Sequence, residues 1–562
     1  MDLQKSTNKL TKVKITFMRY PLNNFFSKTN LQQEFQIKNR WFLFSIFIFF
    51  SLRFFWIANF PMSNDEVYYW DWSRHLQLSY VDAPPFVAWM SFLGTLLLPG
   101  ATGARFLIPF IHTFSTLFIL FSAKKFATLN TKKFTNEMAL SVLIFTQITP
   151  VFNLEGILLL PDATLLLGLS GALYFLLSAF NSCIKSVHEL FSFKYALCFG
   201  FFLGIAALSK YHTFPIAVGF LIASLYLRYK IDKKIDIAFW ITGILVSMLV
   251  ASPVFIWNFQ NNFASFHFQS QHGFAGFSLD FKSFFRYLLG SLFYLLPWFF
   301  ILSIAFVNKF FAQPKKISSY YLLSILPFTI LFLLISFSAL GKQALPHWAM
   351  PGFYLLIPAI VNEWKPFTGT RIIAWKIYCT ISLIISVIVP TAICTQSFNN
   401  LLIKTFIYFT GNASPLAQVF QWQTLQDELK NQLNIKLKTQ PYPTNENCSS
   451  HYQIASLRWY WTAQMAFYFN NQPKIYNFDF TNTSFYSWRD PLYNLEGCKF
   501  IVLGSLNHYN EANLEKVMNI EYQEEFSLSP YDDNKIILIK GTMKSKEILN
   551  KVYEKNKREI RY

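Results

Sequence analysis

Two adjacent carboxylates, Asp65 and Glu66, lie just beyond the first long apolar segment of the chain, in the stretch NDEVYYWDWSRHLQLSYVDAPPFVAWM (64–90). A carboxylate at an apolar boundary is partly desolvated, and desolvation raises its pKa toward the range in which it can accept a proton from a hydroxyl group. The same two acids also suit the first turn of a helix, where they interact with its positive end. The pattern therefore fits either a general base at Asp65 or a simple helix cap.

Two further carboxylates are candidates for a supporting role. Asp82 precedes Pro84 and Pro85, where it could form a turn that ends a helix, orient an acceptor or hold a divalent cation. Asp162 follows Pro161 in the apolar run GILLLPDATLLLGL, and a proline and an acid are ordinary at a helix start. An acid so close to hydrocarbon is nevertheless costly unless it faces a polar cavity. Asp162 is therefore a candidate for a supporting role in the site, beside its ordinary interpretation as an acid at a helix start.

Several basic and polar residues could bind an anion. Lys210 and its neighbour Tyr211 lie in LSKYHTFP, where the lysine either snorkels to lipid headgroups or stabilises a phosphate charge in a low dielectric. His347 begins an apolar run, with Lys342 nearby, and its ordinary interpretation is an incidental interface histidine. Arg74, in the first loop, is a weaker candidate.

Positioning these groups requires a membrane domain. The 562 residues are 53% hydrophobic, 19% aromatic and 14% charged, which is too apolar for a soluble enzyme of this size. We predict a polytopic α-helical membrane protein with about eleven spans, amphipathic helices on its outer face and a small C-terminal α/β domain. The predicted spans are 41–58, 105–123, 138–152, 157–180, 195–209, 213–228, 236–253, 286–308, 319–338, 346–362 and 372–396.

The distribution of lysine and arginine predicts the orientation. Basic clusters occupy the N-terminal segment and every second loop after it, for example Lys124 and Lys125, whereas the intervening loops hold isolated bases. Basic residues are retained on the cytoplasmic side of short loops, so the N-terminus should be cytoplasmic and the Asp65 loop periplasmic. This topology accounts for most of the net charge of +19. Because no nucleic-acid-binding signature accompanies that charge, we expect no nucleic acid partner.

Composition predicts four parts of the chain. In the first outer loop, a capping box at Ser63 and Glu66 should open a helix through Leu78, and a second helix should run from Phe86 to Leu98. The C-terminal domain should combine helices near 416–433 and 451–470 with buried strands at 499–506 and 535–541, and its Cys448 and Cys498 could pair. The parts are a basic cytoplasmic tail at 1–40, a transmembrane domain at 41–400 with its first periplasmic loop at 59–104, a periplasmic α/β domain at 415–545 and a basic tail at 546–562.

Five stretches of the chain resemble the protein O-mannosyltransferase-like membrane glycosyltransferases of the C superfold. That group includes the aminoarabinose and lipopolysaccharide-core sugar transferases of bacteria. The stretches lie in the expected order within about residues 41 to 400. They are DEVYYWDWSRHLQLSYVDAPPFVAW, LLLPDATLLLGLSGALYFL, GIAALSKYHTFPIAVG, SPVFIWNFQNNFASFHFQ and PHWAMPGFYLLIPAI.

The resemblance implies an inverting sugar transfer from a polyprenyl-phosphate donor to an envelope glycolipid, such as lipid A or the lipopolysaccharide core. The setting would be the periplasmic face of a bacterial inner membrane. Asp65 would deprotonate the acceptor, and Glu66 would support Asp65 or contact the acceptor. Lys210 and Arg74 would hold the leaving phosphate. Ala83 departs from the related sequences, which often carry His or Lys there, and so removes a possible phosphate or sugar contact.

Other readings of the sequence stay open. The protein O-mannosyltransferases share the same loop design, so a protein could be the acceptor. A transporter or flippase for lipid-linked sugars would show ionisable residues near the membrane midplane and two matching halves. Most charged residues instead map to span ends, and Arg53 should snorkel to the outer interface. A divalent metal ion is possible, and no spacing of histidines and carboxylates decides it.

Overall fold

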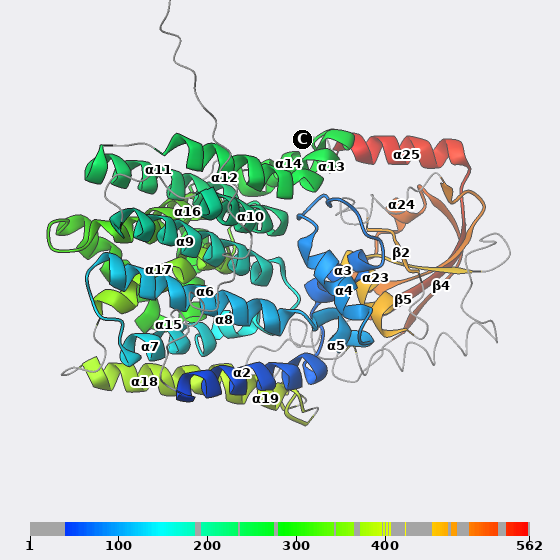
Figure 1. Ribbon diagram of the computed structural model, residues 1–562. Helices are drawn as coiled ribbons and strands as arrows, with labels where there is room; N and C mark the ends of the chain where they lie inside the picture. Colours follow the sequence, from blue (N-terminus) through cyan, green and yellow to red (C-terminus); the bar gives the residue numbers. More distant parts are fainter. Residues whose placement is uncertain are drawn as a thin grey trace, which may run out of the picture.

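The protein consists of a bundle of long helices, a small mixed β-sheet beyond one end of it, and short helices between the two (Figure 1). The computed structural model describes residues 40–185, 193–233, 236–274, 279–341, 344–364, 371–395, 397–399, 401–402, 404–405, 422, 452–469, 474–479, 494–526 and 535–559. The predicted helix at 416–433 except residue 422, the tail at 1–40 except its last residue, Lys342 and Cys448 lie outside these residues.

Helices make up most of the described chain. The first half contains α2 (Arg40–Asn59), α3 (Asn64–Ser73), α4 (Phe86–Thr95), α5 (Gly100–Arg105), α6 (Ile108–Leu129), α7 (Asn136–Gln147), α8 (Pro150–Glu155), α9 (Pro161–Lys185), α10 (Phe193–Ser209), α11 (Thr213–Asp232), α12 (Ile237–Val250), α13 (Ser252–Gln260) and α14 (Ala264–Phe274). The bundle is completed by α15 (Phe281–Ala312), η2 (Ser319–Tyr321), α16 (Leu322–Leu340), η3 (Pro346–Ala349), α17 (Met350–Glu363), α18 (Arg371–Leu383), η4 (Ile384–Ile388) and α19 (Val389–Ile393).

Seven helical stretches of the described chain are long and apolar enough to cross a membrane, and α12 with α13, bent by 57°, would make an eighth. The prediction of a polytopic helical membrane protein is confirmed. The predicted count of eleven exceeds what length and composition support. The three remaining segments do form helices, but α7, α10 and α17 have only 12, 17 and 14 residues, whereas a span ordinarily needs about 20.

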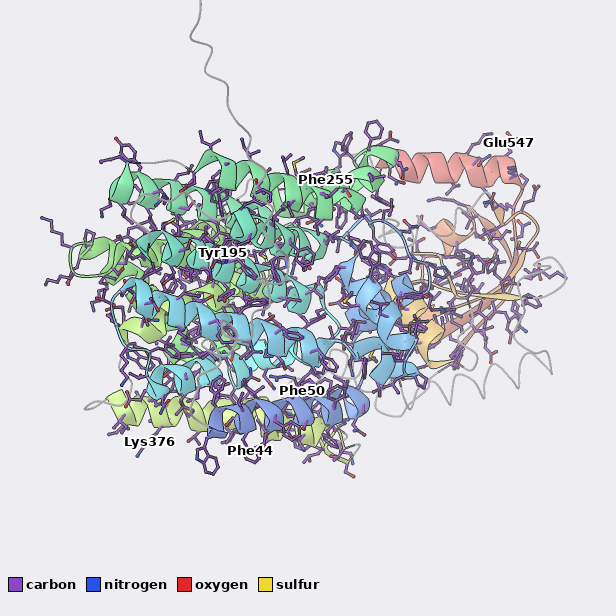
Figure 2. All side chains as sticks on the ribbon, in the orientation of Figure 1. Phe44, Phe50, Tyr195, Phe255, Lys376 and Glu547 are labelled. Atoms are coloured by element: carbon purple, nitrogen blue, oxygen red, sulfur yellow. The ribbon has the colours of Figure 1, made fainter. Side chains whose placement is uncertain are left out.

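The outside of the bundle is apolar, as a lipid-facing surface requires. Phe44 on α2 and Phe255 on α13 are 53% and 47% exposed, and Figure 2 shows them at opposite edges of the bundle. Phenylalanine is among the residues most often buried in water-soluble proteins. Its repeated exposure here is consistent with membrane insertion of these helices.

Arg53 corrects one expectation about the first span. Its side chain is 1% exposed and does not snorkel. It donates from Nη1 to Gln147 Oε1 at 2.7 Å and from Nη2 to Asn153 Oδ1 at 3.0 Å. Because α7 and α8 supply these acceptors, the guanidinium group is solvated by protein within the bundle and has no need to reach the interface.

The first outer loop folds into short helices, and the predicted capping box is present at its start. The helix α3 begins at Asn64 as expected but ends at Ser73, before the predicted Leu78. Tyr80 explains the early end, because its ring stacks on Trp72 at 3.9 Å. Its hydroxyl group also lies 3.0 Å from the carbonyl oxygen of Trp72 and 3.1 Å from that of His75. These contacts hold the chain in a turn in place of another helical turn.

The C-terminal region forms a five-stranded sheet in the order β2-β1-β3-β5-β4. The strands β1 and β3 are parallel, as are β1 and β2, whereas β5 runs antiparallel to β3 and β4. The two predicted strands are confirmed as β3 and β5, but residues 451–470 do not form one helix, because the first of them join the sheet as β1. The elements are β1 (Gln453–Ser456), α23 (Trp459–Tyr468), β2 (Tyr476–Asn477), β3 (Lys499–Ser505), η6 (Leu506–His508), α24 (Glu511–Leu514), β4 (Met518–Phe526), β5 (Ile536–Met543) and α25 (Lys546–Glu559).

The cysteines of the sheet region and those of the bundle differ in oxidation state. Cys498, at the start of β3, is disulfide-bonded. Four cysteines in or beside the bundle are not disulfide-bonded: Cys183, Cys198, Cys379 and Cys394. A disulfide in the C-terminal region is consistent with an oxidising compartment.

The sheet docks on the first outer loop. Side chains of α3, α23 and one face of the sheet share a single hydrophobic cluster. Within it, Trp70 packs edge-on against Phe467 with ring centroids 4.9 Å apart, and Gln464 donates to Asn64 Oδ1 at 2.9 Å. The helix that carries Asp65 is therefore held from the side of the C-terminal domain as well as from the bundle (Figure 1).

Candidate active site

Glu66 is fixed within the protein. Its side chain is fully buried and accepts hydrogen bonds from Arg105 Nε at 2.6 Å and Nη2 at 2.7 Å. It also accepts from the backbone amide of Leu159 at 2.8 Å and from the amide and hydroxyl groups of Ser63, both at 3.0 Å. Both carboxylate oxygens are thus occupied by donors on three separate segments. Glu66 joins the first loop to α5 and to the entrance of α9.

Asp65, one residue earlier, has the opposite environment. Its side chain is exposed, and its carboxylate accepts no hydrogen bond from the residues that the structure describes. Although the side chain is accessible, the protein around it partly desolvates the carboxylate; this desolvation, followed by the charge of Glu66, raises the pKa of Asp65 to about 6, against an opposing effect of Lys210. An accessible carboxylate with a pKa slightly below neutrality is ionised at pH 7 and still basic enough to take a proton.

Lys210 and Asp162 form an ion pair next to this acid. Lys210 Nζ lies 2.8 Å from Asp162 Oδ1 and 2.9 Å from Oδ2, and the two side chains are 16% and 7% exposed. The pair joins the start of α9 to the turn between α10 and α11. His347, on η3, is close enough for its charge to affect Asp162. The structure thus brings together four of the residues proposed from sequence: Asp65, Asp162, Lys210 and His347.

Asp82 lies on the other side of the first loop. The hydroxyl group of Tyr68 is 3.5 Å from Asp82 Oδ1, and the backbone carbonyl of Asp82 accepts from Gln269 Nε2 at 2.7 Å. Burial is the main cause that raises the pKa of Asp82 to about 7, and the charge of Asp65 contributes. Asp82 therefore belongs to the same acidic neighbourhood.

Tyr211 connects the neighbourhood to the middle loop. Its hydroxyl group donates to Ser265 Oγ at 2.8 Å, and Ser265 in turn donates to Asn258 Oδ1 at 2.7 Å. Ser265 and Asn258 belong to α14 and α13. The prediction that Tyr211 lies near the candidate site is consistent with this placement, because the charge of Asp82 reaches it.

Arg74 is not placed with these residues. It caps the far end of α3, where its Nη1 pairs with Asp71 Oδ1 at 3.3 Å and its guanidinium group lies 5.0 Å from the centre of the Trp70 ring. Its backbone is about 14 Å from that of Asp65 along the helix axis. Lys342, the remaining candidate, lies outside the described residues.

Two further residues of the neighbourhood were not singled out from sequence. Tyr69 has its pKa raised well above 10 by burial and then by the charges of Asp65, Asp82 and Asp162. Glu155, at the end of α8, is buried and has its pKa raised by burial and by Asp162; its Oε2 has no hydrogen-bond partner within the described part of the chain. Tyr69 could have been found from its spacing of four residues after Asp65, which places both on one helix face.

The described residues contain no group of three or more histidine, cysteine, aspartate or glutamate side chains arranged to hold a metal ion. The possible divalent ion therefore stays a prediction.

Comparison with known proteins finds a similarity in the central part of the chain. Residues 82–257, which include Asp82, Asp162, Lys210 and Tyr211, match the family described as dolichyl-phosphate-mannose-protein mannosyltransferases. This stretch, less than half of the chain, is similar to that glycosyltransferase family. The resemblance predicted from the sequence is confirmed. Asp65 and Glu66 lie ahead of the matched region.

Two kinds of relative extend this result. The chain is 29% identical over 203 residues to the lipid A galacturonosyltransferase RgtD of Rhizobium johnstonii, a match that spans 35% of this chain and 38% of that enzyme. The crystal structure of ArnT from Cupriavidus metallidurans bound to undecaprenyl phosphate superposes with a TM-score of 0.59 at 13% identity, covering 89% of this chain and 98% of ArnT. The apo form of ArnT gives a TM-score of 0.53. The protein therefore has an ArnT-like fold over most of its length.

Proposed function

We propose that this protein is an inverting glycosyltransferase that moves a sugar from a polyprenyl-phosphate donor to a hydroxyl or phosphate group of a cell-envelope glycolipid. The family match and the fold shared with ArnT support a lipid-phosphate sugar as the donor. The partial match to a lipid A galacturonosyltransferase supports lipid A or the lipopolysaccharide core as the acceptor. A protein acceptor is the alternative, because the family is named for protein mannosyltransferases.

The observation that carries the proposal is the accessible carboxylate of Asp65 beside the ion pair of Lys210 with Asp162. Glycosyl transfer from a lipid phosphate needs a base for the acceptor and a cation for the departing phosphate. Asp65 and Lys210 lie near each other at one end of the bundle, and the buried Glu66 holds the helix turn that carries Asp65 in position. General base catalysis of this kind contributes typically ~10²- to 10⁴-fold to a rate.

In the proposed reaction, Asp65 takes the proton of the acceptor hydroxyl while the acceptor oxygen attacks the anomeric carbon of the sugar. The bond from that carbon to the phosphate oxygen breaks, and the polyprenyl phosphate leaves with the electron pair. Lys210 neutralises the phosphate charge, and His347 and Tyr211 contact the donor. Asp162 keeps Lys210 in place between turnovers. A phosphate acceptor is already ionised and requires Asp65 less.

We also propose eleven membrane crossings, with the candidate site in the periplasm of a bacterial cell and the N-terminus in the cytoplasm. The short segment of η3 and α17 supports this count. This segment begins at Pro346, next to the His347 that lies near Asp162, and it ends at Glu363, which pairs with Lys132 beyond the far end of α6. The chain therefore passes from one end of the bundle to the other across this segment.

The test is a deletion strain complemented with wild type or with Asp65→Asn, followed by mass spectrometry of lipid A, core oligosaccharide and other envelope glycans. We expect a hexose, pentose or uronic acid mass to disappear in the deletion and to fail to return with Asp65→Asn. The substituted protein must be present in the membrane at the wild-type level. Asp280→Asn, which alters a carboxylate that caps α15, is the matched control and should restore the glycan. Full restoration by Asp65→Asn would exclude Asp65 as the base.

A further inference from the structure

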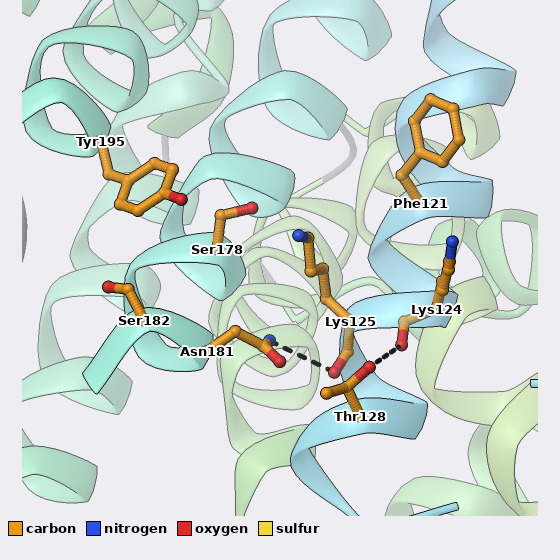
Figure 3. Close-up of a pocket in the computed structure, with 8 residues that line it drawn as sticks. All are labelled: Phe121, Lys124, Lys125, Thr128, Ser178, Asn181, Ser182 and Tyr195. Carbon is orange, nitrogen blue, oxygen red and sulfur yellow. Dashed lines mark hydrogen bonds between the residues drawn. The ribbon is translucent and has the colours of Figure 1, made fainter. Parts of the chain in front are cut away.

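A polar cavity lies at the end of the bundle remote from Asp65. Its volume is about 200 Å³, and it is lined by side chains of α6, α9 and α10 (Figure 3). Its lining includes Lys124 and Lys125 of α6, and Ser178 of α9. From Arg105, beside the first loop, to Lys125 the helical path is about 30 Å long, which is the thickness of the hydrocarbon core. The cavity and the candidate active site therefore belong to opposite membrane surfaces.

The cavity is built for an anion. Lys124 and Lys125 are both half-buried, although lysine is usually exposed. Ser178 is 2% exposed, and its Oγ lines the cavity without a hydrogen-bond partner in the described chain. Figure 3 shows this hydroxyl group and the ammonium group of Lys125 turned into the same space. A buried hydroxyl group without a partner carries a desolvation cost that a bound acceptor would remove.

The frame of the cavity is held by hydrogen bonds to the backbone of its two lysines. Asn181 Nδ2 donates to the backbone carbonyl of Lys125 at 3.3 Å and to that of Leu177 at 2.9 Å, which ties α9 to α6. Thr128 Oγ1 donates to the carbonyl of Lys124 at 3.1 Å. The two lysine backbones are therefore fixed before a ligand binds, which lowers the entropy cost of binding.

We infer that this cavity binds the phosphate group of an anionic phospholipid from the membrane leaflet opposite the active site. A phosphate oxygen would accept from the Ser178 hydroxyl group beside the ammonium group of Lys125, while Lys124, whose side chain extends toward Phe121 (Figure 3), would add positive charge at the edge of the cavity. Basic pockets between transmembrane helices are a known form of headgroup recognition. The volume is below the ~300 to 1,000 Å³ of pockets that enclose a drug-sized ligand, so it suits a headgroup whose acyl chains stay in the bilayer. A free phosphate ion has the same chemistry and is the other source to test.

The experiment uses the delipidated full-length protein in neutral detergent and measures binding by native mass spectrometry. The probes are phosphatidylglycerol, phosphatidylcholine and inorganic phosphate, each titrated alone and in competition. The pocket variants are Lys124→Gln with Lys125→Gln, and Ser178→Leu, which fills the cavity without changing the charge. The control is Lys315→Gln with Lys316→Gln, a pair of exposed lysines outside the cavity. Thermal unfolding confirms that each variant is folded.

A basic residue near an anionic lipid surface contributes roughly a fivefold change in affinity. We therefore expect phosphatidylglycerol to bind about 25-fold more weakly to the double lysine variant, and Ser178→Leu to lose the same bound lipid, while the control pair stays within about twofold. Loss of inorganic phosphate binding alone in these variants would assign the cavity to a soluble phosphate. Equal binding of all three probes to wild type, pocket variants and control would overturn the inference.

Discussion

Asp65 and Glu66 are neighbours on one turn of α3 and have the same charge, yet their side chains point into two different surroundings. Glu66 points into a sealed network in which Arg105, Leu159 and Ser63 supply its hydrogen bonds. Asp65 is exposed and accepts no hydrogen bond from the described residues. The comparison shows that chemical availability depends on what surrounds a carboxylate. Glu66 positions the first loop, whereas Asp65 stays accessible to a substrate.

The largest effect on stability should come from Glu66→Gln. The substitution leaves the Arg105 guanidinium group buried without a countercharge, which costs about 3–5 kcal/mol of unfolding free energy when a buried pair is broken on one side. Denaturant unfolding of the purified protein measures this loss. Asp65→Asn is the matched control at the adjacent position, and we expect its unfolding free energy to stay within about 0.5 kcal/mol of wild type.

The combined Glu66→Gln and Arg105→Gln variant sharpens this comparison. Removing both charges leaves no unpaired ion, so the double variant should be less destabilised than the sum of the two single variants. If Asp65→Asn destabilised the protein as strongly as Glu66→Gln, the division between a positioning acid and a reactive acid would be wrong.

Lys210 should have a smaller effect, measured as activity with the donor. A hydrogen bond to a charged group is worth about 1.5–3 kcal/mol, so Lys210→Gln should lower kcat/KM for the lipid-phosphate sugar by roughly 10- to 100-fold. Lys210→Arg keeps the charge and should recover part of this loss. The control Lys282→Gln removes an exposed lysine at the start of α15 and should leave kcat/KM unchanged. An unchanged kcat/KM in Lys210→Gln would show that the ion pair with Asp162 is structural alone.

Local sequence patterns predicted the parts of this site that depend on near neighbours. The capping box of α3, the early acid of α9 and the positions of the helices all follow from spacings of a few residues. The pairing of Lys210 with Asp162 joins residues 48 apart, and that of Arg105 with Glu66 joins residues 39 apart. Such contacts are decided by helix packing, and a single sequence holds no local signal for them. The role of Glu66 as an anchor was missed for this reason.

Glu155 and Arg53 show how a charged residue in or near an apolar run signals a site, and Arg53 shows how that signal was misinterpreted. Both are charged residues in or near apolar runs, which marks a residue for attention. The prediction that Arg53 snorkels was based only on its position along the first span. It did not consider that Gln147 and Asn153, on other helices, could accept hydrogen bonds from its guanidinium group. For Arg53, the polar residue in an apolar run indicated partners on other helices and not a route to the interface.

The smallest effect, and the most specific to Asp65, is on the pH dependence of the reaction. The raised pKa of about 6 means that Asp65 loses its base form as the pH falls through 6. The value of kcat/KM should therefore be constant near neutrality and fall about tenfold for each pH unit below 6. Because the charge of Lys210 lowers the pKa of Asp65, Lys210→Gln should move this inflection to higher pH. Donor and acceptor ionise identically in both assays, so a shift between wild type and variant originates in the enzyme. An inflection at the same pH in both proteins would mean that the titrating group is not Asp65.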